Sequence, residues 1–205
     1  MNDLCVLKLG GSLLDLPDLV ERFQFVREAI APGPALLVVG GAESAELVRQ
    51  FDQQFQLGEE CGHWLAVRAM QFNAHVVSAV LPLSTIVCDV VEAQEAWSRS
   101  RLAVVEPLAW LQKEERDGRG VPHRWSFTSD SIAARIATQI GAARLILLKS
   151  TLPPRGQCGP DCVAGLGIVD ADFPAASKDV PAIELINLRH AALATDAAAV
   201  RCVLR

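Results

Sequence analysis

The chain has 205 residues, of which 51% are hydrophobic and 21% are charged, and its formal net charge is −5. This length predicts a single domain over residues 1–205 whose core needs no disulfide or metal, and the composition excludes a disordered chain. The acidic balance argues against nucleic acid or an anionic membrane surface as a partner. No apolar run is long enough to span a bilayer and the N-terminus lacks the basic start of a signal peptide, so we expect a cytoplasmic protein.

Apolar runs alternate with helical periods along the first half of the chain. The runs at 4–9 and 35–39 predict strands that are buried on both faces. Apolar residues spaced three and four apart predict helices at 17–30 and 63–80, and another helix is expected to pass through 46–51.

The second half continues this alternation less regularly. Expected strands lie at 85–88, 101–105 and 143–148, with further candidates at 182–188 and 200–204. Between them we expect a helical turn at 108–112, a polar loop at 113–124, a helix from a Thr128 cap to Gly141, and a Pro- and Gly-rich loop at 151–167. Strands that alternate with helices predict an α/β fold, a three-layer αβα sandwich with a mainly parallel central sheet.

The six cysteines do not form an obvious disulfide framework. Cys5, Cys88 and Cys202 lie in apolar runs, where a reduced cysteine behaves as a small hydrophobic residue. Cys158 and Cys162 have a spacing that suits half of a zinc site or a redox pair, but no second Cys/His pair lies nearby. We therefore favour a loop with incidental cysteines.

The lysines are more informative, because there are only four of them against fifteen arginines. Lys8 and Lys149 each come at the end of an apolar run, in CVLKLGG and RLILLKS. In a parallel sheet these positions face the crevice in which α/β proteins bind ligands. A single such lysine is more simply explained as a side chain that extends from a sheet edge to water. Two lysines in matching positions favour a shared site.

Two predicted strands end in a pair of glycines, in LKLGGS and VVGGAES. Glycines allow backbone N–H groups to approach an anion closely, and the N-terminus of a following helix favours negative charge. Neither the dinucleotide fingerprint nor the P-loop motif is present. One glycine pair alone would suit a tight turn equally well, but two pairs with two lysines predict a polyphosphate site.

The segment WSFTSDS places three hydroxyl groups and a carboxylate in the first turn of a predicted helix. Thr128 as the cap and Asp130 near the positive end of the helix dipole would explain it structurally. In a site, Asp130 could instead orient both lysines or help to hold Mg²⁺.

In combination these motifs resemble the amino acid kinase family, which includes acetylglutamate, aspartate, carbamate and uridylate kinases. The resemblance is carried, in order, by residues 6–14, 38–49, 127–137, 145–150 and 167–174. It implies transfer of the ATP γ-phosphoryl group to a carboxylate, carbamate or phosphate oxygen, with ATP and Mg²⁺ as cofactors and no residue assigned as a metal ligand. Phosphoryl transfer depends on positioning and charge neutralisation, which suits lysines and glycine-rich loops.

The same resemblance implies a role for individual residues. The catalytic residues would be Lys8, Asp130 and Lys149. The nucleotide would be bound by Gly10, Gly11, Ser12, Lys149, Ser150, Asp170 and Phe173, the last two near the adenine and ribose. The acceptor would be bound by Gly40, Gly41, Ala42, Arg68, Thr128 and Ser129.

Arg68 enters this set because His63, Trp64 and Arg68 share a face of the predicted helix and an arginine suits an anionic acceptor. The alternative is a Trp64 in the core and an Arg68 in a surface ion pair.

The polar loop around His123 is a candidate lid. The apolar helix at 63–80 is the best candidate for an interface in a homo-oligomer, which is the usual state in the family.

A narrower resemblance is to the small kinases of methanofuran biosynthesis, which convert an aminomethyl-furan-methanol phosphate to its diphosphate. It rests on CGHWLAVRAMQFNAHVV and HRWSFTSDSIAAR.

Two features depart from the family: Ala42 stands where a third glycine is common, and the loop after Lys149 lacks the usual Asp-Gly turn. They leave a non-catalytic nucleotide or oxoanion binder, or a kinase acting on UMP or a carboxylate, as alternatives.

Overall fold

A computed structural model describes residues 3–154, 158–193, 195 and 200–204. Their seven strands form one sheet in the order β3-β4-β2-β1-β5-β6-β7, in which all neighbours are parallel except β6 and β7. The strands are β1 (Cys5–Leu9), β2 (Ala35–Val39), β3 (Ser84–Val87), β4 (Leu102–Val105), β5 (Arg144–Lys149), β6 (Ile183–Asn187) and β7 (Arg201–Leu204).

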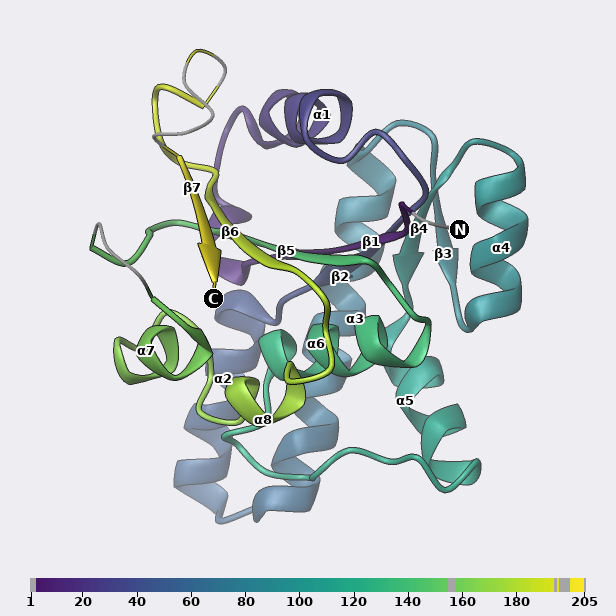
Figure 1. The fold of residues 1–205 in the computed structure, drawn as a ribbon. Helices are drawn as coiled ribbons and strands as arrows, with labels where there is room; N and C mark the ends of the chain where they lie inside the picture. The colour runs from purple at the N-terminus through teal and green to yellow at the C-terminus, as the bar shows by residue number, and fades with distance from the viewer. Residues whose placement is uncertain (1–2, 155–157, 194, 196–199, 205) are drawn as a thin grey trace.

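Helices cover both faces of this sheet, as Figure 1 shows with α1 on one side and α6 and α8 on the other. They are α1 (Leu19–Ala29), α2 (Ala42–Phe55), α3 (Glu59–Val80), α4 (Val90–Ser98), α5 (Pro107–Arg116), α6 (Ser129–Gln139), α7 (Pro160–Gly165) and α8 (Phe173–Ala176). The predicted three-layer α/β fold with a mainly parallel sheet is therefore confirmed. Within the described part of the chain, no helix has both the length and the apolar character needed to cross a bilayer.

The central strands are apolar throughout because both of their faces are buried. Val6 and Leu36 point into the core shared with α6, whereas Leu7 and Leu37 point into the core shared with α1. Covering both faces removes the alternation of apolar and polar residues that an exposed sheet shows. Lys8 belongs to the same face as Val6, so its ammonium group is directed to the α6 side of the sheet.

The second half contains more helix than the sequence predicted. The expected turn at 108–112 is part of α5, which continues through Arg116 into the expected polar loop. The expected loop at 151–167 contains α7, which begins at Pro160. Helices as short as α7 and α8 offer too few turns for a helical period to be recognised.

Cys158 and Cys162 form a disulfide, with their Cα atoms 5.5 Å apart. The expectation that these two cysteines are incidental is therefore wrong, because α7 begins between them and its first turn brings the two sulfurs together. A disulfide at this spacing is compatible with the redox pair that the sequence left open. Among the described residues, no group of three or more His, Cys, Asp or Glu could hold a metal ion.

Phe173 lies in the core, although the family resemblance placed it near the adenine. Its side chain is completely buried, on the side of the sheet covered by α6. A ring without an open face has no surface to offer a nucleotide base. Its contribution is therefore to the stability of the fold.

Replacing Phe173 with alanine should lower the free energy of unfolding by about 3–5 kcal/mol, because the truncation leaves a cavity in the core. Urea denaturation would measure the loss. The matched control is Phe55→Ala, since the side chain of Phe55 is 61% exposed; we expect a change of about 0.5 kcal/mol or less. Unchanged stability with a raised KM for ATP would show that the ring contacts the nucleotide instead.

Candidate active site

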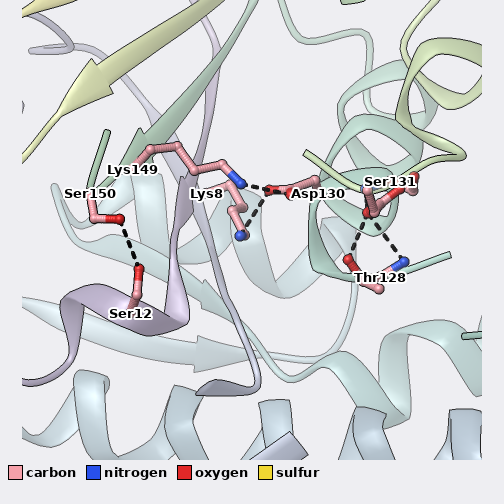
Figure 2. Close-up of polar contacts among 8 residues, drawn as sticks. Lys8, Ser12, Thr128, Asp130, Ser131, Lys149 and Ser150 are labelled. Atoms are coloured by element: carbon pink, nitrogen blue, oxygen red, sulfur yellow. Dashed lines mark hydrogen bonds and ion pairs between the residues drawn. The ribbon is translucent and has the colours of Figure 1, made fainter. Parts of the chain in front are cut away.

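Two lysines from neighbouring strands meet one buried carboxylate. Lys8 lies on β1 and Lys149 ends β5, and these strands pair in parallel, so both side chains reach the same region. The first turn of α6 places Asp130 between them (Figure 2). Lys8 Nζ is 2.8 Å from Asp130 Oδ1, and Lys149 Nζ is 2.7 Å from Asp130 Oδ2.

The three charges are buried together and control each other's protonation. Burial alone would raise the pKa of Asp130, but the ammonium groups of Lys8 and Lys149 outweigh it and the pKa is lowered. Burial and then repulsion by Lys8 lower the pKa of Lys149 to about 8, while Asp130 opposes them. With two ammonium groups and one carboxylate, the cluster has a net positive charge near neutral pH, which suits a bound polyphosphate.

Asp130 is a poor candidate for a Mg²⁺ ligand. Each of its two oxygens is already within 2.8 Å of an ammonium nitrogen. A metal ion at the same oxygens would have to displace a lysine and stand beside its positive charge. The sequence left two functional roles open for Asp130, to orient the two lysines or to help hold Mg²⁺. The geometry favours the first of these roles.

The two glycine loops touch each other and the first turn of α6. A Cβ atom at Gly11 would lie only 2.5 Å from the backbone N of Ala42. A Cβ atom at Gly40 would lie 2.9 Å from the backbone N of Gly11 and 3.2 Å from Ser129 Oγ. A buried amide from α3 supports the contact, since Asn73 Nδ2 donates to the carbonyl oxygen of Gly40 over 2.9 Å. The glycines thus let two chain segments pack at backbone distance.

Ala42 occupies a backbone conformation that favours glycine. Its φ is +50°, in the left-handed region. An alanine there costs about 1–2 kcal/mol relative to the right-handed region. The position that commonly holds a third glycine in the family therefore keeps the glycine-like conformation in this chain.

The residues after β1 and β5 are also connected. Ser12 Oγ donates to Ser150 Oγ over 3.4 Å, as seen in Figure 2. Gly10 N donates to the carbonyl oxygen of Leu148 over 3.0 Å, which continues the pairing of the two strands. Gly10, Ser12 and Ser150 thus lie in the segments that directly follow the two lysines.

Asp170 serves the protein scaffold, although the resemblance placed it beside the ribose and adenine. Its Oδ2 accepts hydrogen bonds from the backbone N and Oγ1 of Thr128 and from the backbone N of Ser131. Its Oδ1 accepts one from Ser131 Oγ. Thr128 is the N-cap residue of α6, as predicted, but its side chain makes no capping bond within the helix. Asp170 provides that cap from another segment.

A cavity of about 200 Å³ lies between α2, α3 and the N-terminal end of α6. Four residues expected to bind the acceptor line it, namely Gly41, Ala42, Thr128 and Ser129. Gly40 is buried behind it. Arg68 does not line it, because its side chain is exposed and the residues of α3 that face the cavity are His63, Ala66, Val67 and Met70.

Sequence reasoning missed three large side chains of this cavity, Arg49, Arg124 and Trp125. The guanidinium of Arg49 lies 4.6 Å from the centre of the Trp125 ring. Trp125 Nε1 donates to Asp52 Oδ2 over 2.7 Å, and Arg124 forms an ion pair with Asp172. The signal available was the position of Arg124 and Trp125 directly before SFTSDS.

His63 is a neutral member of the cavity wall. Burial and then the nearby His123 lower its pKa to about 4. The two imidazole rings stack with their centres 4.8 Å apart. Trp64 packs against the core beside them, as the alternative interpretation of this helix held.

The decisive comparison is with models of protein families. The model of the amino acid kinase family matches residues 3–151 of this chain. The chain belongs to the amino acid kinase family. This kinase membership indicates ATP-dependent phosphorylation of a small metabolite. Among curated proteins, none matches the chain.

Solved structures of kinases have a similar fold. UMP kinase from Bacillus anthracis gives a TM-score of 0.67 at 10% identity, over 99% of both chains. Uridylate kinase from Archaeoglobus fulgidus gives 0.61 at 19% identity, over 88% of this chain and 89% of that one. Aspartate kinase from Synechocystis gives 0.56 at 14% identity, over 89% of this chain and 37% of that one. At such identities the likeness shows the fold alone.

Replacing Gly11 with alanine should separate the two glycine loops of this kinase, because the new Cβ atom would collide with the backbone of Ala42. We expect a loss of about 1–3 kcal/mol in the free energy of unfolding. Gly165→Ala is the matched control, since a Cβ atom there meets nothing within 4 Å. Thermal and urea unfolding of both variants would test this; equal stability of the two would contradict the close contact.

Proposed function

We propose that this protein is an ATP-dependent kinase whose acceptor is a small phosphomonoester. The observation that carries the proposal is the buried cluster of Lys8, Asp130 and Lys149, which presents net positive charge beside two glycine loops. Phosphoryl transfer is promoted mainly by positioning and by stabilisation of charge on the transferred group. The cluster and the loops supply these two contributions.

The nucleotide phosphates would lie against the ends of β1 and β5. Lys8 would approach the γ-phosphoryl group, with the backbone of Gly10 and Gly11 and the hydroxyl of Ser12 beside the phosphates. Lys149 and Ser150 would contact them from β5. Mg²⁺ bound with ATP would supply further positive charge to the phosphates.

In the proposed reaction, an ionised oxygen of the acceptor phosphate attacks the γ-phosphorus of ATP. A P–O bond to the acceptor forms while the bond from the γ-phosphorus to the β,γ-bridging oxygen breaks, and its electron pair leaves with ADP. The products are ADP and the acceptor diphosphate. An ionised oxygen carries no proton to remove, so no general base is required. This suits a site whose central carboxylate has both oxygens engaged by lysines.

The acceptor would occupy the cavity between α2, α3 and α6. Its volume of about 200 Å³ is below the ~300–1,000 Å³ of typical drug-sized sites, which suits a small acceptor. Arg49 and Arg124 line the cavity with Trp125, and each arginine pairs with a carboxylate, Glu46 and Asp172 respectively. An anionic acceptor would have to compete with these carboxylates for the two guanidinium groups. Both segments that resemble the methanofuran kinases contribute to this wall, so we propose aminomethyl-furan-methanol phosphate as the first acceptor to test.

The test is ADP release from MgATP with the furan phosphate, UMP and small carboxylates offered separately. Release with the furan phosphate alone is the expected result. Release only with UMP or a carboxylate would keep the kinase and replace its acceptor. Binding of ATP without ADP release on any acceptor would contradict the proposal and favour a non-catalytic binder.

In the same assay, Lys8→Met should reduce turnover by at least about 100-fold, because a charge on the transferred group loses its partner. Lys178→Met is the matched control, since Lys178 is exposed and lies on the short segment after α8. Circular dichroism would verify that both variants fold. Equal turnover of the two variants would exclude the assigned role of Lys8.

We also propose that the protein associates with copies of itself through α3. Phe72, Val76 and Val80 are spaced four residues apart and are 62%, 45% and 51% exposed, so they form an apolar stripe on one face of the helix. Large exposed apolar residues grouped in this way often mark an interface. Members of the resembled family usually associate, which supports self-association as such.

Light scattering after size exclusion should give a multiple of the chain mass of 22.1 kDa. Val76→Glu should shift the protein to the monomer, because a charge would be buried in the apolar contact. Phe55→Glu, on α2, is the control with a similarly exposed apolar residue and should leave the mass unchanged. A wild-type monomer at micromolar concentration would refute self-association.

A further inference from the structure

Asp170 lies between α7 and α8 and makes four hydrogen bonds to the start of α6. Two of its donors are backbone N–H groups, of Thr128 and Ser131, at 3.2 and 3.0 Å. The other two are the hydroxyl groups of the same residues, with Thr128 Oγ1 at 2.7 Å. Figure 2 labels Thr128 and Ser131 beside Asp130. One carboxylate thus accepts hydrogen bonds from both the backbone and the side chain of Thr128 and of Ser131.

The first turn of a helix has N–H groups without partners inside the helix and a partial positive charge. A helix normally satisfies part of this need with the side chain of its own N-cap residue. Thr128 stands at that position but makes no such bond, and its hydroxyl donates to Asp170 instead. The start of α6 therefore depends on a carboxylate from a segment far along the chain.

Asp130 lies between the two residues that Asp170 holds. Fixing the backbone at Thr128 and at Ser131 fixes the direction in which the side chain of Asp130 leaves the helix. That side chain is the shared partner of Lys8 and Lys149. A displacement of the first turn would therefore open at least one of the two ion pairs.

We propose that Asp170 is a positioning residue of the phosphoryl-transfer site, which sets the first turn of α6 so that Asp130 meets both lysines. The proposal rests on the proposed function for its catalytic consequence. It assigns Asp170 a contact with the protein scaffold in place of the nucleotide contact that the family resemblance implied.

Asp170 also acts on Lys149 through space. Its negative charge raises the pKa of Lys149, against the lowering by burial and by Lys8 and together with Asp130. The groups that act on this ammonium thus come from β1, from α6 and from the segment after α7. Removal of the Asp170 charge should lower the pKa of Lys149 further. Because this direct effect of the charge does not depend on where Asp130 lies, a variant that loosens the cap but keeps the Asp170 charge is needed to reveal positioning.

The experiment is an NMR titration of the protein with ¹³Cε-labelled lysine, which gives few signals because the chain has only four lysines. Lys149→Arg assigns the signal of interest by its loss. The expected wild-type midpoint is about 8. Asp170→Asn should move the midpoint to lower pH. Asp172→Asn removes the same charge from a carboxylate that instead pairs with Arg124, and it should leave the midpoint in place.

Kinetics give the second measurement. If transfer requires a charged Lys149, kcat/KM falls as the pH rises through its pKa in the free enzyme. In Asp170→Asn this alkaline decline should begin at lower pH, and kcat should fall about 10–100-fold, as for other residues that orient a reacting group. Ser131→Ala is a milder variant that removes one bond and keeps the Asp170 charge. It should lower kcat and move the Lys149 midpoint to lower pH, because a displaced Asp130 supports the pKa of Lys149 less.

The outcomes separate this proposal from the proposed function. Suppose that the wild type phosphorylates none of the acceptors but the Lys149 midpoint shifts in Asp170→Asn. This result would support the coupling of Asp170 to the lysine site and would contradict the proposed kinase activity. An active wild type whose Asp170→Asn variant has a lower melting temperature but an unchanged midpoint and pH profile would refute the positioning role. Should Asp170→Asn not fold, a normal kcat in Ser131→Ala would overturn it.

Discussion

The carboxylate of Asp130 is the constraint on which the rest of the site depends. Burying two ammonium groups beside each other is unfavourable unless an opposite charge lies between them. Asp130 supplies that charge and thereby connects β1, β5 and α6 at their functional ends. Removal of Asp130 would leave two buried ammonium groups without compensation. The same arrangement leaves one positive charge without an internal partner, and this excess is what an anionic ligand would neutralise.

A short acidic segment connects this cluster to the cavity wall. Asp170 binds the first turn of α6, and Asp172, two residues later, pairs with Arg124 at the cavity. The two carboxylates therefore hold two parts of the 124–131 region from outside it. Since this segment follows Lys149 and α7 in the chain, its placement depends on how the disulfide-containing part of the molecule folds. The site is in this way assembled from residues distant in sequence.

Much of the fold and of the charged cluster could be predicted because the relevant signals are local. Strands buried on both faces must be apolar throughout, so Lys8 and Lys149 stand out at their ends. The missed features depend on contacts between distant segments or on helix phase. Asp170 reaches Thr128 over 42 positions, which no local pattern encodes. In α3, the residues at 63, 66, 67 and 70 share the cavity face, and Arg68 falls outside it. The complete burial of the Phe173 side chain could not be inferred from its place in the family motif at 167–174.

The backbone contact between Gly11 and Ala42 has a thermodynamic consequence. The two loops touch without intervening side chains, so neither can shift without moving the other. A ligand that draws one loop toward itself changes the conformation offered by the second loop. If the two loops bind donor and acceptor as proposed, their affinities for these ligands would be linked by a coupling free energy, and the linkage would be reciprocal. In the proposed kinase, the contact of Gly11 with Ala42 would therefore make donor and acceptor occupancy interdependent.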